Sequence, residues 1–190
     1  MARPSGRNLR EEIIDSATGL VQERGVNGFS YGDLAKDLGV KAPSIHHHFR
    51  TKQDLLAEVA RRYRAAFAAQ RDDLPGRRAS DRITGYSALF TGRSAENQLC
   101  LCGAVAADWY AVGEQPRAEV EEFFADQVAW LRTQIRMGID AGEFTAGLDI
   151  DTAARSMLAA LEGSLLMSRV GGARALPTVV AVQLLEWMTD

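Results

Sequence analysis

Hydrophobic residues recur every three or four positions along most of the chain, which is the spacing of helices with one buried face. The first such stretch runs from Leu9 to Arg24 and is followed by Gly25. A longer one begins near Lys52 and continues to Arg71. No strand pattern and no internal repeat stand out. The pattern therefore predicts an all-α protein.

The same periodicity predicts a helical body after the long helix. Leu74-Pro75-Gly76 interrupts the pattern, and residues 98–112, QLCLCGAVAADWYAV, are apolar enough to run through the interior. We divide the chain into an N-terminal head, residues 1–52, and a C-terminal body, residues 53–190. Further helices of the body are expected over residues 81–93, 116–141, 149–170 and 176–188.

The most informative stretch is residues 28–52, GFSYGDLAKDLGVKAPSIHHHFRTK. Ser30 followed by Asp33 is the capping-box signal for the start of a helix. Gly39 suits the left-handed backbone position that ends a helix without a Cβ penalty. A second short helix is predicted from about Lys41 to Phe49. Two short helices joined by a glycine-containing turn have the form of a helix-turn-helix.

The second short helix has two different sides. At about 100° per residue, Ile45 and Phe49 face inward and pack on the first short helix. Pro43, Ser44, His46 and His47 point the other way, between Lys41 and Lys52. That outward side is short, polar and slightly basic, without a wide apolar stripe. It suits a DNA major groove, with neighbouring side chains on phosphates.

This run resembles the DNA-binding domain of the tetracycline-repressor (TetR) family of bacterial transcriptional regulators. The matching residues are Phe29-Ser30, Asp33-Leu34-Ala35, Leu38-Gly39-Val40, Ile45, His48-Phe49 and Lys52-Gln53-Asp54-Leu55. The family usually has an aromatic residue in place of His46 and Ser or Thr in place of Lys41, which bears on the operator that is read.

The resemblance implies a sequence-specific regulator that binds double-stranded operator DNA as a homodimer. It also implies a repressor with an N-terminal three-helix head, released from a palindromic operator by a small molecule bound in the body. The residues that we expect to contact DNA are Ser30, Lys41, Pro43, Ser44, His46, His47, His48, Lys52 and, from a basic N-terminal arm, Arg3.

The last two predicted helices carry apolar residues on more than one face. A monomer rarely needs apolar cover on all sides of its terminal helices. A two-fold dimer that pairs these helices as a four-helix bundle explains the pattern. The residues assigned to this interface are Met157, Leu161, Leu165, Val179, Leu184 and Trp187.

Composition and charge add bounds to this interpretation. The 190 residues are 46% hydrophobic and 25% charged, as in a soluble globular protein. No secretory signal and no apolar run long enough for a membrane span are present, and two cysteines make no disulfide framework, so a cytoplasmic location is expected. The net charge is −3, yet residues 1–52 carry an excess of positive charge, where phosphate contacts are expected.

Aromatic and small residues of the body are candidates for an effector site. Trp and Tyr combine an apolar surface with one polar group, which suits a small aromatic or amphipathic ligand. The alternative is that each is an ordinary core residue. The ligand-binding candidates are Tyr86, Phe90, Cys102, Ala106, Trp109, Tyr110 and Trp130.

Cysteine chemistry offers a second function on the same DNA-binding frame, a redox or electrophile sensor. Cys100 and Cys102 lie two positions apart, so on a helix they face opposite ways and do not readily bridge each other. The alternative is that both are small buried hydrophobic residues.

An enzyme is the least expected class. The three consecutive histidines, the only ones in the chain, project about 100° apart on a helix and do not converge on one metal ion. The body shows no nucleophile–base pair, phosphate loop or metal-ligand spacing. No cofactor, metal or membrane partner is therefore expected. Among the carboxylates of the body, only Asp108 and Glu162 lie in strongly apolar surroundings.

Overall fold

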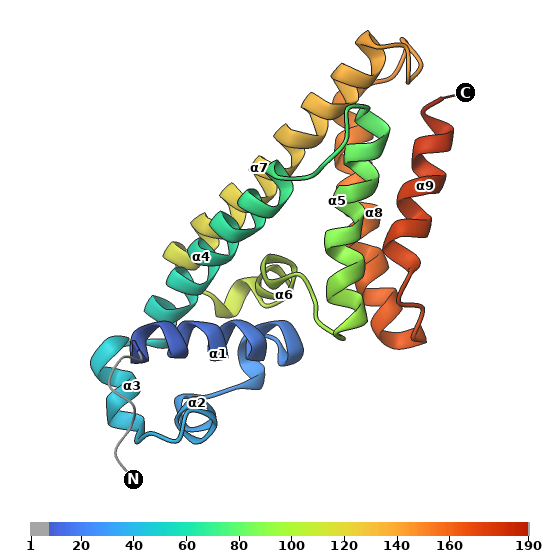
Figure 1. Ribbon diagram of the computed structural model, residues 1–190. Helices are drawn as coiled ribbons and strands as arrows, with labels where there is room; N and C mark the ends of the chain where they lie inside the picture. The colour runs from blue at the N-terminus through green and yellow to red at the C-terminus, as the bar shows by residue number, and fades with distance from the viewer. Residues whose placement is uncertain (1–7, 190) are drawn as a thin grey trace. The chain divides into compact units, whose positions relative to one another are not determined.

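The computed structural model describes residues 8–189, and within that range it contains helices and no strands (Figure 1). This confirms the predicted all-α class. The helices are α1 (Leu9–Arg24), α2 (Tyr31–Asp37), α3 (Ala42–His48), α4 (Lys52–Asp72), α5 (Ala79–Ala95), α6 (Leu101–Ala107), α7 (Glu114–Asp140), α8 (Ile150–Gly171) and α9 (Leu176–Trp187), with 3-10 turns η1 (Val26–Gly28) and η2 (Trp109–Ala111).

The chain forms two compact units. The first combines residues up to 65 with residues 101–120, and the second combines residues 66–100 with residues 121–190. Both units are therefore discontinuous in sequence, whereas the division predicted at residue 52 is sequential. A segment from the middle of the chain, α6 and the start of α7, belongs to the same unit as the helix-turn-helix.

The first unit is built around α1. Its N-terminus is capped by Asn8, whose side chain accepts the Arg10 N–H at 3.2 Å, and it ends at Gly25, which has a φ of 77°. α1 contacts α2 and α6, and α2 packs against α3 (Figure 1). The buried core of these elements consists of Ile13, Ile14, Ala17, Val21, Leu34, Ala35, Ile45, Phe49, Leu55 and Leu56.

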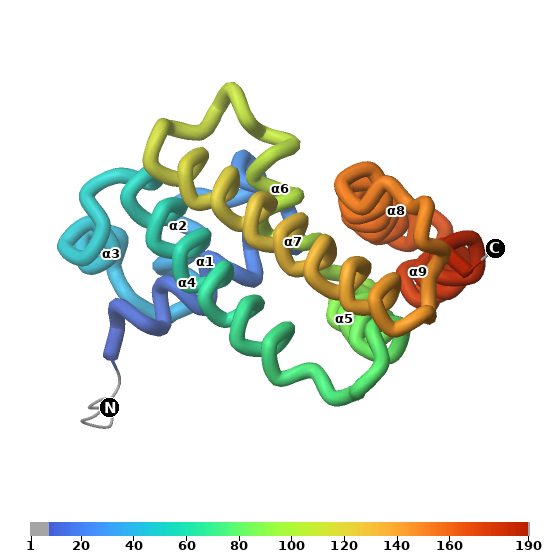
Figure 2. The backbone as a smooth tube through the Cα atoms, turned by 90° about the horizontal axis from the view of Figure 1, so that it is seen from above, coloured from blue at the N-terminus to red at the C-terminus, as the bar shows by residue number. Residues whose placement is uncertain are grey.

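The second unit has α5 packed against α8 and α9, as both views show (Figure 1, Figure 2). Its interior is aromatic: Phe67 makes edge-to-face contacts with Phe90 and Phe123, and Trp130 stacks on Tyr86 at a centroid distance of 5.0 Å. Such contacts add to the apolar area that the rings bury.

The start of α5 lacks a local side-chain cap and is held from the α7–α8 connection. The carboxylate of Glu143 accepts the N–H groups of Ala79 and Ser80 at 3.0 and 3.1 Å. A Cβ at Gly138 would lie 2.2 Å from the ring of Phe144, so this close approach of the connection to α7 requires glycine.

The apolar segment 98–112 is less regular than its composition indicates. Cys100 precedes α6, because Asn97 takes a left-handed backbone with φ 57° after α5 and the chain becomes helical only at Leu101. Cys102 is buried as expected, whereas Tyr110 in η2 is 97% exposed. The two cysteines therefore do not share a helix, and the segment does not stay inside throughout.

Candidate nucleic-acid interface

The entry into the helix-turn-helix is set by the capping box at α2. The N–H of Asp33 donates to the Ser30 hydroxyl at 3.3 Å, and the N–H of Ser30 donates to the Asp33 carboxylate at 2.8 Å. The hydrogen bonds from Ser30 lower the pKa of Asp33. After α2, Gly39 takes the left-handed conformation at φ 63°. The predicted start and end of α2 are thus both found.

Helix α3 has one anchored side and one open side. Ile45 is fully buried, and Phe49, which follows the helix, is also buried. Ser44 is half-buried. The exposed side chains are Lys41, Pro43, His46, His47 and His48. The helical spacing predicts the buried Ile45 and Phe49 and the exposed Pro43, His46 and His47, whereas Ser44, expected on the outward side, is only half exposed. The open side leaves donors and acceptors available to a partner surface.

Tyr31 of α2 holds the end of α3. Its hydroxyl donates to the carbonyl oxygens of Phe49 at 3.1 Å and Thr51 at 2.6 Å. Its ring meets the His46 ring edge-to-face at a centroid distance of 4.6 Å. Burial, with a smaller contribution from the charge of Asp54, raises the pKa of Tyr31 to about 12, so the hydroxyl stays a donor.

Lys52 is held by backbone rather than left facing outward. Its Nζ donates to the carbonyl oxygens of Val26 and Phe29 at 2.6 and 2.5 Å and lies 4.1 Å from the centroid of the Phe29 ring. Burial lowers the pKa of Lys52. The negative charges of the nearby Asp108 and Asp33 act in the opposite direction and raise it. Its primary role in this structure is to fix the α1–α2 turn, and a phosphate contact stays a prediction.

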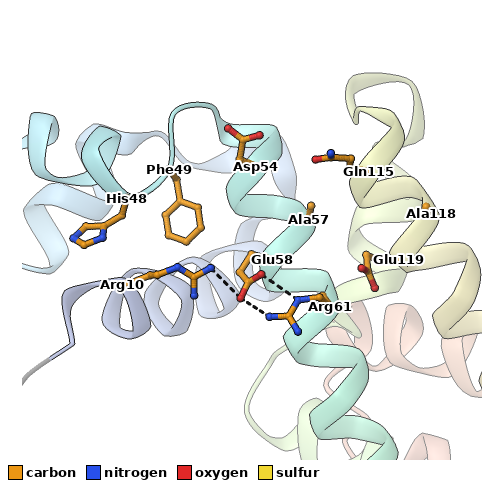
Figure 3. A pocket seen from close by; sticks show the side chains of 10 residues that line it. All are labelled: Arg10, His48, Phe49, Asp54, Ala57, Glu58, Arg61, Gln115, Ala118 and Glu119. Carbon is orange, nitrogen blue, oxygen red and sulfur yellow. Dashed lines mark hydrogen bonds and ion pairs between the residues drawn. The ribbon is translucent and has the colours of Figure 1, made fainter.

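Arg10 joins α1 to α3 and α4 beside a groove of about 550 Å³ in the first unit (Figure 3). Its guanidinium lies 3.1 Å from the Glu58 carboxylate and 5.2 Å from the centroid of the Phe49 ring. Arg61 donates to the same carboxylate, which lowers the pKa of Glu58. The groove carries both signs of charge. Its ion pairs join α1 to α4 and Glu58 to Arg61 within α4, and Arg10 also meets the ring of Phe49, the residue that follows α3.

The predicted effector residues are distributed over both compact units. In the second unit, Tyr86 and Phe90 are fully buried and Trp130 stacks on Tyr86. The other four lie in the first unit: Cys102 is buried, Ala106 and Trp109 are half-buried, and Tyr110 is exposed. Their common role in ligand binding stays a prediction.

The predicted interface residues divide into two groups. Met157, Leu161 and Leu165 are buried within the bundle of their own chain, so they offer no surface to a partner. Val179 and Trp187 are 59% and 64% exposed. Leu184 is half-buried. The exposed apolar side chains of α8 and α9 are Leu166, Met167, Val170, Val179, Val182 and Trp187.

The predicted contact residue Arg3 lies outside residues 8–189, the part of the chain that the structure describes. The described side chains contain no cluster of three His, Cys, Asp or Glu able to hold a metal ion. Cys100 and Cys102 are both buried and form no disulfide. None of the helices described here has the length and apolarity that a bilayer crossing requires. The feature that stands out is a capped helix pair with an open polar side, which defines a DNA-binding helix-turn-helix protein.

Comparison with known protein families agrees with this assignment to the helix-turn-helix proteins. Residues 13–59 match the family of bacterial regulatory proteins of the tetR family, and residues 81–183 match the tetracyclin repressor-like C-terminal domain. Together the two matches cover most of the chain, which therefore belongs to the TetR family. The protein is a ligand-responsive, DNA-binding transcriptional regulator, as the resemblance to this family implied.

Individual relatives are distant but cover most of the chain. The transcriptional repressor KstR2 of Rhodococcus jostii is 26% identical over 98% of this chain and 91% of its own length. KstR2 of Mycobacterium tuberculosis is 25% identical over 80% of this chain and 78% of its own. A TetR-family regulator from Agrobacterium tumefaciens is 26% identical, with a TM-score of 0.90 over 95% of this chain and 97% of that one. These relatives give the cysteine-based alternative no specific support.

Proposed function

We propose that the protein is a homodimeric repressor whose two α3 helices read the half-sites of a palindromic operator. The observation that carries this proposal is the open side of α3, where Lys41, His46 and His47 are exposed and Ile45 is buried. A reading helix needs such a division, because the anchored side fixes the orientation of the side chains that reach base edges. The KstR2 relatives are named as repressors.

The side chains of α3 divide by chemistry. Ser44, His46 and His47 carry donors and acceptors that suit base edges in the major groove. Lys41 and Pro43, at the start of the helix, lie where phosphate and sugar contacts are made. His48, at the end of the helix, and Ser30 and Lys52, outside it, complete the proposed contacts with the DNA backbone. Arg3 of the N-terminal arm adds a minor-groove contact.

The exposed apolar side chains of α8 and α9 support a two-fold dimer. Val170 is 92% exposed, and Trp187 and Val179 are more than half exposed on the neighbouring helix. Exposed apolar side chains gathered on two helices that pack together are a feature of interaction sites. A two-fold contact between copies of α8 and α9 covers them and supplies two reading helices for two half-sites.

We place the effector among the aromatic side chains of the body. Glu162 of α8 supports a polar contact there, because its Oε1 is shut off from water and has no hydrogen-bond partner among residues 8–189. Tyr86 and Trp130 offer stacked ring surface. A small aromatic or amphipathic molecule fits this chemistry. Such a ligand can release the protein from the operator only to the extent that it binds the DNA-free conformation more tightly than the DNA-bound one.

Selection of DNA duplexes from a random library with the purified full chain tests the proposal. The expected product, called the selected duplex below, is a palindrome with half-site centres about 34–36 Å apart or a multiple of that distance. It should bind two chains. A set of selected sequences without two-fold symmetry, or no enrichment at all, would count against the dimeric reading mechanism.

The effector direction is tested with the selected duplex and a panel of small aromatic and amphipathic compounds. A compound that binds the chain and lowers its affinity for the selected duplex is expected. If binding compounds only raise that affinity, the ligand acts as a corepressor and the proposed direction is wrong.

A further inference from the structure

A carboxylate from the middle of the chain holds the turn that leads into α2 and α3. Asp108, the residue after α6, accepts the N–H of Val26 on Oδ2 at 3.0 Å and the side-chain amide of Asn27 on Oδ1 at 3.0 Å. These residues form η1, between α1 and α2, and Gly25 gives η1 no side-chain cap of its own. Asp108 therefore supplies the missing acceptor from a distant part of the sequence.

The same turn is held from its other side by α4. Val26 donates its N–H to Asp108 and accepts Lys52 Nζ on its carbonyl oxygen, and the carbonyl of Phe29 is a second acceptor for Lys52. Val26 and Phe29 are almost completely buried. Backbone groups in such a place have no water to replace a lost partner, so both contacts matter to the position of the turn.

A second attachment lies next to Lys52 in sequence. The Gln53 side chain accepts the N–H of Gly113 at 2.7 Å and donates to the carbonyl of Ala111 at 3.2 Å. Arg117 donates to the carbonyl of Trp109 at 3.0 Å. Residues 108–113 are thus bonded to η1, to the first turn of α4 and to α7, all within the first compact unit.

We infer that Asp108 is a positioning residue for operator reading, since it holds the α1–α2 turn from which α2 and α3 extend. Asp108 lies within residues 81–183, which match the family's C-terminal domain, yet it bonds to the DNA-binding head. The inference rests on the proposed function, because it concerns how well α3 is aligned for a half-site.

The test uses Asp108→Ala and Asp108→Asn in the full chain. Asparagine keeps one acceptor but places an N–H₂ group against a second donor, so it loses one of the two bonds. Glu114→Gln is the matched control, because it removes the same charge from an exposed position in the first turn of α7. Affinity is measured on the selected duplex and on a scrambled duplex of equal length, with thermal melting and amide exchange at Val26.

Faster exchange at Val26 and a loss on the order of tenfold in affinity for the selected duplex are expected for Asp108→Ala. Affinity for the scrambled duplex should change little, because non-specific attraction to phosphates needs no alignment. Glu114→Gln should match the wild type in the ratio of the two affinities.

The inference is overturned if a folded Asp108 variant keeps the wild-type ratio of the two affinities. This holds whether neither affinity changes or both fall by the same factor. If Asp108→Ala does not fold, the same criteria apply to Asp108→Asn, which keeps one bond. Failure of the wild-type chain to select any duplex instead rejects the proposed function, so the two failures are distinct.

Discussion

Two carboxylates show how differently single residues are used in this chain. Asp108 has a hydrogen-bond donor on each oxygen, and both donors belong to η1. Glu162 has one oxygen without a partner among the described residues. Burial raises the pKa of Glu162 to about 7, although a hydrogen bond from Cys100 and the charge of Arg93 act in the other direction. Its ionisation therefore opposes folding near neutral pH.

The Glu162→Gln variant tests this effect on stability. In the unfolded chain the carboxyl ionises near its ordinary pKa of 4.5, and in the folded chain near 7, so the wild type loses stability as pH rises through this interval. At pH 8 the variant should be more stable by on the order of 2–3 kcal/mol, and at pH 4.5 the difference should largely vanish.

Urea unfolding of both proteins at several pH values measures this difference. A constant gap between wild type and variant across the range would show that Glu162 does not titrate as described.

At the scale of elements, α3 depends on its neighbours. It has seven residues, too few to be stable as an isolated helix. Its inner side is fixed by Ile45, and its end is fixed by the two hydrogen bonds from Tyr31. The position of the exposed side of α3 thus depends on contacts with its neighbours, among them those of Tyr31.

Tyr31→Phe keeps the ring beside His46 and removes both hydrogen bonds. We expect a loss of about 1–2 kcal/mol in the free energy of unfolding and a weaker preference for the selected duplex over the scrambled one. Tyr110→Phe makes the same chemical change at a 97% exposed ring and is the control. Equal stability of the two variants would mean that the Tyr31 hydroxyl does not fix the end of α3.

Local signals in the sequence are sufficient to predict where α2 and α4 begin. The Ser30 and Asp33 pair marked the start of α2, and Thr51 and Asp54 form the same reciprocal contacts before α4. Capping depends on residues three positions apart, so it can be read directly from sequence. The contact of Asp108 with Val26 joins residues 82 positions apart and leaves no such local signal.

At the scale of the whole molecule, periodicity predicted burial but not what covers the buried side. Met157, Leu161 and Leu165 were expected at a dimer interface, and they are instead covered by their own chain. An apolar helical stripe looks the same whether its cover comes from the same chain or from a partner. Only exposure in the folded chain identifies Leu166, Met167 and Val170 as the side chains left uncovered.

Val170→Asp tests the assignment of that uncovered surface. A carboxylate buried against a partner without a counter-charge should weaken dimerisation by at least about tenfold, and the helical content should be unchanged. Met137→Asp replaces another exposed apolar residue, on α7, and serves as the control. Sedimentation across a concentration series gives the dissociation constants. If the dissociation constants of the Val170→Asp and Met137→Asp variants are equal, the dimer interface lies elsewhere.

The central claim is that the open side of α3 reads DNA, and the double variant His46→Ala, His47→Ala tests it most directly. Affinities for the selected and scrambled duplexes are compared with those of the wild type at one fixed salt concentration, since both depend on salt. Loss of two base contacts, each worth about tenfold or more, should lower affinity for the selected duplex by roughly a hundredfold and leave the scrambled duplex nearly unaffected. Unchanged affinity for the selected duplex in the folded double variant would contradict the account.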